Sequence, residues 1–182
     1  MKPRTYTSEG IVLAKKNYGE ADKIFIIFTM NFGKISLIAK SVRRPKSRKR
    51  GHLEIFNKIS FNAVKSHGLD LLIEAEVIDD YQIIRQSLKK VSLAYYFCEV
   101  IGKITHEGET QKDIFELLVN SLKNLENTKK LKVLRLDFIY KLLTILGYWP
   151  KDKIMTNHDL LLEEVIERNI NSMRVGKIIS SG

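Results

Sequence analysis

The densest positive charge in the sequence lies between residues 41 and 50, where six of ten residues are Lys or Arg. No Asp or Glu occurs anywhere from Lys23 to Leu53. Arg offers phosphate oxygens a planar fork of donors, and Lys offers a mobile point charge. A run of one sign inside a folded region therefore indicates a polyanion partner, with nucleic acid as the first candidate. A localisation signal and a solvated surface are the alternatives.

We expect phosphate contacts from this basic run and from lysines that flank the preceding strand. Lys34 and Lys40 are six residues apart, a spacing that puts both side chains on one face of a strand. The candidate nucleic-acid-binding residues are Lys34, Lys40, Arg43, Arg44, Lys46, Arg48, Lys49 and Arg50. Tyr18 and Phe32 lie at turns where a ring could stack on a base, whereas Phe56 is expected to pack in the core.

Residues suited to catalysis or metal binding lack the spacing that such chemistry needs. Cys98 is the one cysteine and lies in an apolar helical context, which predicts a buried thiol. Asp79 and Asp80 could belong to a metal-dependent nuclease, but their place between a strand and a helix favours N-capping. Neither a GxGxxG nor a GxxxxGK[ST] phosphate loop is present. We expect a binding protein that is not an enzyme, with no catalytic residues, cofactor or metal.

A hydrophobic pattern of period two between residues 5 and 80 predicts the strands that position the basic run. Ile59, Phe61 and Ala63 alternate with polar residues, as in half-buried antiparallel strands. Five strands are predicted, near residues 7–16, 22–29, 34–40, 55–65 and 69–78. Five short strands suit a closed barrel, and the basic run is its longest connection. An OB-fold has its longest excursion there, with an SH3-like barrel as the main rival and a sandwich fragment as a weaker one.

After residue 80 the apolar pattern changes to the helical period of 3.6. Wide apolar stripes predict helices near residues 91–104, 114–125, 131–146 and 158–173, which suits the core of a bundle. We therefore predict an α+β chain of two domains. Residues 1–80 form a five-stranded OB-fold barrel that binds nucleic acid, and residues 81–182 form an all-α helical bundle.

A second basic group lies on the predicted helices. It could receive an acidic peptide tail that ends in an apolar residue, or it could be a solvated helical face. Its members are Lys123, Lys129, Lys130, Lys132, Arg135 and Lys141.

The bulk composition is that of an ordinary globular protein of 182 residues, with 44% hydrophobic residues and a net charge of +10. No apolar run approaches the roughly 20 residues that span a bilayer, and the N-terminus lacks the apolar region of a signal peptide. We expect a cytoplasmic protein without a membrane partner.

Several short runs of the sequence follow one another at a recognisable spacing. They are Thr7–Leu13, Tyr18–Ile24, Phe32–Lys40, Val42–Arg48, Gly51–Phe56 and Ile73–Val77, with Leu146–Tyr148 further on. These motifs closely resemble the RecO family of bacterial recombination mediators. The first 80 residues match nearly throughout, and the helical half matches more loosely.

The resemblance implies an OB-fold followed by a helical domain. It also implies binding of single- and double-stranded DNA, annealing of complementary strands, and help in loading RecA onto strands coated by single-strand DNA-binding protein. The implied partners are RecR and the acidic tail of single-strand DNA-binding protein, and the implied location is the bacterial cytoplasm, in association with the nucleoid.

This sequence departs from the family after Tyr148, where many members carry a four-cysteine zinc module. We interpret it as a compact member that lacks this module and binds no metal. The alternatives are an RNA- or ribosome-associated OB-fold module and a protein-interaction scaffold.

Overall fold

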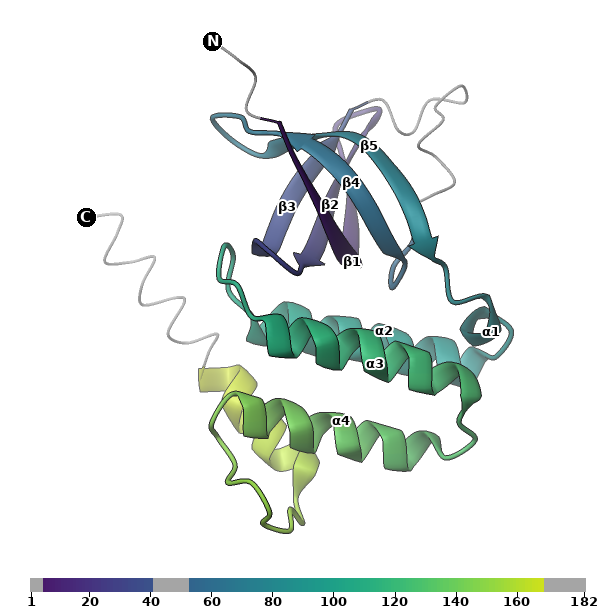
Figure 1. Cartoon of the computed structure of the whole chain (residues 1–182), viewed down its shortest axis with the longest axis vertical. Coiled ribbons are helices and arrows are strands. Elements are labelled where there is room, and N and C mark those ends of the chain that lie inside the picture. The colour runs from purple at the N-terminus through teal and green to yellow at the C-terminus, as the bar shows by residue number, and fades with distance from the viewer. Residues whose placement is uncertain (1–4, 41–52, 169–182) are drawn as a thin grey trace, which may run out of the picture.

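The first half of the chain folds into five β-strands, in the predicted order (Figure 1). They are β1 (Thr5–Tyr18), β2 (Asp22–Thr29), β3 (Gly33–Ala39), β4 (Lys58–Val64) and β5 (Asp70–Asp79). The computed structural model describes residues 5–40 and 53–168. In β4, Ile59, Phe61 and Ala63 are buried while the residues between them are half-buried. The predicted strands are confirmed, although β4 begins at Lys58 and not near residue 55.

The strands close into a barrel in the order β1-β2-β3-β5-β4. Neighbouring strands are antiparallel except β3 and β5, which run parallel through the pairs Leu37–Asp70 and Ile38–Leu71. This closed order, with the long connection between β3 and β4, is that of an OB-fold and not of an SH3-like barrel or a sandwich fragment. The barrel has its own inner core, which includes Val12, Phe25, Ile27, Leu37 and Phe61.

Gly10 lies where β1 pairs with β2 on one side and β4 on the other, opposite Thr29 and Ile59. A Cβ atom at this position would lie 2.5 Å from Cγ2 of Ile27 and 2.9 Å from the carbonyl oxygen of Phe28. Real Cβ atoms do not approach that closely, so the pairing of β1 with both of its neighbours at this position depends on glycine.

The second half of the chain is helical, as its period of 3.6 predicts. The helices are α1 (Gln82–Arg85), α2 (Leu88–Ile104), α3 (Lys112–Asn127) and α4 (Leu131–Ile145). Residues 158–168 form a further helix, drawn in yellow-green and without a label in Figure 1. The apolar pattern did not predict the single turn of α1. The last predicted helix was expected to reach residue 173, and its end lies outside the described residues.

The turn into α1 differs from the predicted N-cap. Asp79 accepts a hydrogen bond at Oδ1 from the backbone N–H of Tyr81 (2.9 Å). The N-cap residue is Tyr81, whose backbone is left-handed with φ of 52° and whose side chain makes no capping bond. The capping prediction for Asp79 and Asp80 is therefore wrong, because Tyr81, which follows them, is the N-cap residue. Its side chain is completely buried.

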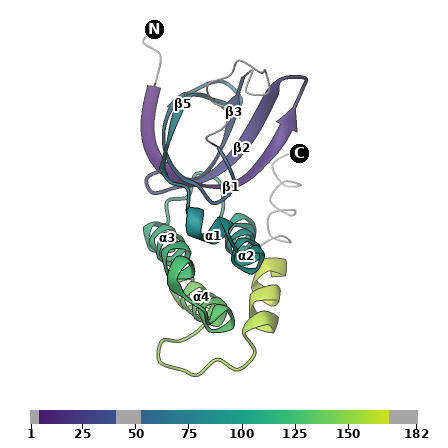
Figure 2. The same cartoon turned by 90° about the vertical axis from the view of Figure 1, so that its right-hand side faces the viewer.

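One apolar core runs from the end of the barrel through the helices. Phe28 of β2 packs against Phe115 of α3 with ring centroids 6.1 Å apart. Phe97 of α2 packs against Phe138 of α4 with a centroid separation of 4.3 Å. Figures 1 and 2 show α2 and α3 lying between the barrel and α4. Because this core joins side chains of the barrel and of the helices, it does not separate residues 1–80 from residues 81–182. The predicted boundary between two domains therefore stays a prediction from the sequence.

The loop between α2 and α3 is fastened to the start of β3. Gly33 has a φ of 66°, and a Cβ atom there would lie 2.0 Å from the carbonyl oxygen of Glu109. The backbone N–H of Gly108 donates to the carbonyl oxygen of Lys34 at 2.9 Å. These contacts fix the position of the barrel relative to the helices on this side of the molecule.

Candidate nucleic-acid interface

Residues 41–52 lie outside the described part of the chain, and they contain six of the predicted contacts: Arg43, Arg44, Lys46, Arg48, Lys49 and Arg50. The structure describes the two flanks of this basic run. Lys40 directly follows β3, and Leu53 precedes β4 and is buried with the inner barrel core. The basic run therefore starts and ends on the barrel.

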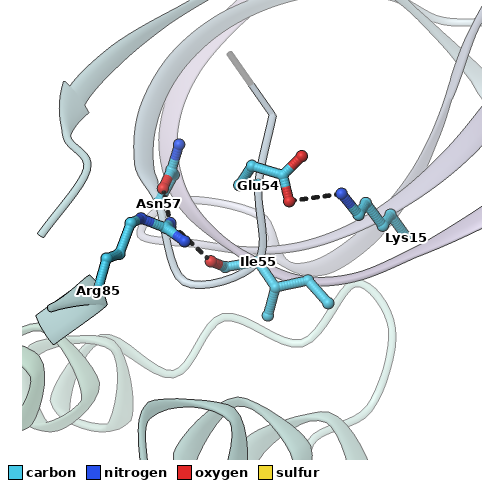
Figure 3. A network of polar contacts seen from close by, with 5 residues as sticks. All are labelled: Lys15, Glu54, Ile55, Asn57 and Arg85. Carbon is cyan, nitrogen blue, oxygen red and sulfur yellow. Dashed lines mark hydrogen bonds and ion pairs between the residues drawn. The ribbon is translucent and has the colours of Figure 1, made fainter. Parts of the chain in front are cut away.

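A network of polar contacts holds residues 53–57, the segment that follows the basic run and forms its second flank (Figure 3). Glu54 forms an ion pair with Lys15 of β1, with 2.5 Å between Oε2 and Nζ. The guanidinium group of Arg85, at the end of α1, donates to the carbonyl oxygen of Ile55 at 3.2 Å and to Oδ1 of Asn57 at 2.5 Å. The flank is thus joined to both the barrel and the helices, and its position is fixed relative to both.

The three candidate stacking rings have different environments. Phe56 is fully buried, with the Arg85 guanidinium carbon 4.0 Å from its ring centroid, so the expected core packing is confirmed. Phe32 is half-buried and packs edge-on against Tyr6, with centroids 4.9 Å apart. Tyr18 is 54% exposed, so it is the one of the three that offers a ring to solvent.

Two exposed lysines, Lys16 of β1 and Lys40 directly after β3, lie on the outer surface of the barrel where the basic run begins. Lys16, Ile24 and Ile38 are consecutive partners across β1, β2 and β3. One alternation step further, Tyr18 and Lys40 occupy the next row on the same side, with Asp22 of β2, the partner of Tyr18, between them. Lys16, Tyr18 and Lys40 are exposed, and the two isoleucines are half-buried. We call these five residues the open face of the barrel.

Lys34 shares a face of β3 with Lys40, as the spacing predicted, but α2 covers the Lys34 end of that face. The Lys34 side chain is buried, and its ammonium group donates to the carbonyl oxygens of Gly102 (2.6 Å) and Thr105. Burial lowers the pKa of Lys34, and the charge of Glu107 acts in the opposite direction. Because this ammonium group joins β3 to α2, we leave Lys34 out of the proposed interface.

The second basic group is spread over α3 and α4 and does not form one surface. Lys141 is paired with Asp137 at 2.8 Å. Lys132 and Arg135 line a groove between α2 and α4. The other members are exposed around the turn between α3 and α4: Lys123, Lys129 and Lys130.

This α2–α4 groove has a volume of about 330 Å³ and includes Lys89 of α2 as a third basic residue. Leu93, Tyr96 and Leu131 provide its apolar lining. The Arg135 guanidinium forms two hydrogen bonds to Asp159, at 2.6 and 2.9 Å, and these bonds hold the pKa of the Asp159 carboxyl below its ordinary value. Sequence reasoning missed Lys89, because a linear charge pattern does not reveal which helices pack together.

The described residues contain few other groups suited to chemistry. Burial raises the pKa of the Cys98 thiol to about 12, in agreement with the predicted buried cysteine. Within residues 5–40 and 53–168, no three His, Cys, Asp or Glu side chains are grouped so that they could hold a metal ion. No helix in those ranges has the length and apolar character needed to cross a membrane. The basic surfaces are therefore the features on which a functional proposal can rest.

An OB-fold barrel with a long basic connection and an attached helical region defines the class of this protein. Residues 1–81 match the family profile described as "Recombination protein O N terminal", and residues 85–151 match "Recombination protein O C terminal". The chain belongs to the RecO family, and the resemblance noted in its sequence is confirmed.

Named relatives are similar along most of this chain. DNA repair protein RecO of Dehalococcoides mccartyi is 33% identical over 162 residues, which cover 88% of this chain and 64% of the relative. DNA repair protein RecO of Listeria monocytogenes is 32% identical over 142 residues, covering 78% and 56%. DNA repair protein RecO of Pelotomaculum thermopropionicum is 31% identical over 147 residues, covering 81% and 57%. The chain therefore spans less than two thirds of the length of these relatives.

Proposed function

We propose that this chain binds single- and double-stranded DNA through the open face of the barrel and the basic run, and that it anneals complementary strands. One observation carries the proposal: Lys16, Tyr18 and Lys40 lie exposed at the point where the basic run leaves β3. The residues proposed to contact phosphates are Lys16, Lys40, Arg43, Arg44, Lys46, Arg48, Lys49 and Arg50.

Annealing requires a surface that neutralises two backbones while the base edges stay free to pair. Contacts to phosphate oxygens position a nucleic acid without reading its sequence, and long Lys and Arg side chains provide such contacts. Binding of this kind releases counterions, so the logarithm of the affinity should fall with the logarithm of salt with a slope of roughly −0.7 per contact for single strands. No covalent bond is made or broken, so annealing needs no catalytic residue.

The proposed cellular role follows the relatives, which are named as DNA repair proteins. We propose that the chain acts with RecR on chromosomal DNA in the bacterial cytoplasm, where it helps to load recombinase onto strands coated by single-strand DNA-binding protein. The acidic tail of that protein fits the α2–α4 groove. Lys89, Lys132 and Arg135 match the tail's carboxylates, and the apolar lining matches its terminal side chain.

The test is fluorescence anisotropy of a labelled DNA single strand across a salt series, followed by an annealing assay. The variant replaces Arg43, Arg44, Lys46 and Arg48 with Ala. A matched control removes the same charge from exposed lysines of the helical half, by replacing Lys123, Lys129, Lys130 and Lys153 with Ala. We expect tight, salt-steep binding by the wild type and the control, and loss of binding and annealing by the variant.

The other outcomes discriminate the alternative functions. Equal binding by the variant and the wild type would contradict the barrel interface and direct attention to the helical lysines. Preference for a structured RNA competitor over the DNA strand would support an RNA-associated module. Absence of salt-dependent DNA binding in all three proteins would support a protein-interaction scaffold, and Mg²⁺-dependent cleavage of the strand would reveal a nuclease.

A further inference from the structure

A groove of about 750 Å³ lies between the outer side of the barrel and α2. Leu13, Ala14 and Ile26 line it from β1 and β2, and Gly102 lines it from α2. Its size falls in the range of pockets that accommodate a drug-sized molecule. We call it the barrel–α2 groove. Of its lining residues, only Lys16 is also a proposed phosphate contact.

An aromatic ring of α2 lines this groove. Tyr95 is 43% exposed, and its ring packs against Phe56 with centroids 5.8 Å apart and an angle of 79° between the planes. Phe56 is itself fixed, because it is fully buried and the Arg85 guanidinium lies over its ring. Tyr95 is therefore a large, solvent-accessible ring with rigid support, as a stacking platform for a planar ligand requires.

The charged groups of the groove are of both signs. Lys16, Lys34 and Lys103 contribute ammonium groups, and Glu99 and Glu107 contribute carboxylates. The Lys34 ammonium group already donates to the carbonyl oxygens of Gly102 and Thr105. Glu99 is paired with Lys103. A mixed lining of this kind does not suit a phosphate inside the groove, but carboxylate oxygens can accept hydrogen bonds from the amino groups of bases. An uncharged, planar group with polar edges is the ligand that this lining fits best.

The groove is continuous with the open face of the barrel through Lys16. This residue lines the groove and also belongs to the row formed with Ile24 and Ile38. A phosphate held by Lys16 would place its attached nucleoside within reach of the groove. We propose that the barrel–α2 groove holds one unstacked base of a bound DNA single strand, with Tyr95 stacking on it. This inference rests on the proposed function, because it assumes that DNA lies on the open face.

The groove site would distinguish free strands from paired ones. A base in the groove is removed from its neighbours, and a paired base in a duplex is not available to enter. Occupation of the groove therefore adds affinity for a single strand and none for a duplex. Pairing with a complementary strand would withdraw the base, which favours release of the annealed product from this part of the surface.

The test compares two labelled oligonucleotides of equal length, one with normal bases and one made of abasic nucleotides with the same phosphates. Tyr95→Ala should weaken binding of the normal strand by about 5- to 150-fold, the range for loss of one stacked base. It should leave binding of the abasic strand unchanged. Tyr95→Phe should retain wild-type binding of both strands, because the ring remains.

Two further variants separate loss of the site from loss of the fold. Tyr148→Ala is the matched control, because Tyr148 has a similar exposure of 45% and does not line the groove. Gly102→Leu fills the groove without removing Tyr95, since a Cβ atom there meets only Leu13 at an ordinary contact distance of 3.9 Å. Gly102→Leu should therefore reproduce the base-dependent loss, while Tyr148→Ala should bind both strands normally.

Each result has one interpretation. Equal weakening of the normal and abasic strands by Tyr95→Ala would overturn the base site and assign Tyr95 a structural role. Unchanged binding of both strands by Tyr95→Ala and Gly102→Leu would also overturn it, as expected if a peptide or a second copy of the chain occupies the groove. In both cases salt-steep binding by the wild type would leave the proposed function intact. If the wild type binds neither strand, the proposed function fails together with the base site.

Discussion

The ammonium group of Lys34 on β3 lies 2.6 Å from the backbone carbonyl oxygen of Gly102 in the last turn of α2. The same group donates to the carbonyl oxygen of Thr105, which follows the helix. Carbonyl groups at a helix C-terminus lack partners within the helix and carry partial negative charge, so a cation there is favourable. A side chain that the sequence suggests for DNA binding therefore fastens the barrel to the helices.

Lys34→Met should lower the free energy of unfolding by about 1–3 kcal/mol, because it leaves buried carbonyl oxygens without their donor. Urea denaturation followed by circular dichroism measures the change. Lys40→Met is the control, because Lys40 is exposed and its replacement should stay within about 0.5 kcal/mol of the wild type. Equal stability of the two variants would show that the Lys34 contacts contribute nothing net.

The same pair of proteins should differ in the pH dependence of stability. Burial lowers the pKa of Lys34 in the folded state below the 10.5 of an exposed lysine, so the unfolded chain binds more protons as the pH rises towards 10.5. Stability from this group therefore increases with pH in that window. The deficit of Lys34→Met relative to the wild type should grow between neutral pH and pH 10, as measured by urea denaturation. A constant deficit would contradict the lowered pKa.

The case of Lys34 illustrates what the sequence could and could not predict. Alternation identified the strands and put Lys34 and Lys40 on one face of β3, because side-chain direction in a strand is a local property. It could not tell that α2 covers one end of that face, since the cover comes from tertiary packing. The same alternation could have revealed Lys16, which precedes the exposed Tyr18 by two residues on β1.

In the helical half, too, local patterns could be predicted from the sequence and tertiary packing could not. Apolar periodicity placed α2, α3 and α4, but it gave no signal for the α2–α4 groove, which forms only when Lys89 and Arg135 meet across two helices. Tyr95 was also missed, because one aromatic residue in an apolar helix looks like core. The basic run was evident from charge alone, and its contacts with DNA remain a prediction.

Gly33→Ala should destabilise the protein by about 3–5 kcal/mol, the upper range for single substitutions. Its left-handed backbone disfavours a side chain, and the added Cβ would lie 2.0 Å from the carbonyl oxygen of Glu109. Gly19→Ala isolates the effect of the left-handed backbone from that of the steric overlap. Gly19 also has a positive φ, of 56°, but a Cβ there meets no atom within 4 Å, so we expect a loss of only about 1–2 kcal/mol. Equal losses in urea denaturation would refute the steric argument.

Lys16→Ala and Lys40→Ala should each make single-strand binding less sensitive to salt. Removal of one phosphate contact reduces the slope of log affinity against log salt by about 0.7. Lys153→Ala serves as the control, because Lys153 is exposed in the segment between α4 and the last described helix. Anisotropy titrations at several salt concentrations give the slopes. Slopes equal to that of the wild type for both variants would remove the open face from the interface.

Asp159→Asn should strengthen binding of an acidic peptide to the α2–α4 groove. Asp159 accepts one hydrogen bond from each terminal nitrogen of the Arg135 guanidinium, at 2.6 and 2.9 Å, so an incoming carboxylate must compete with it for this two-bond edge. The Asp159 side chain is 56% exposed, and an exposed ion pair of this kind is weak. We therefore expect a gain in affinity of about 1.5- to 5-fold.

The measurement is anisotropy of a labelled acidic peptide with an apolar C-terminal residue. Arg135→Ala should weaken binding of this peptide, because the groove loses the group that Asp159 competes for. Asp137→Asn is the matched control: it removes the same charge from an ion pair on α4, with Lys141, that does not line the groove. If Asp137→Asn and Asp159→Asn strengthen binding equally, the gain comes from net charge, and the peptide does not engage Arg135.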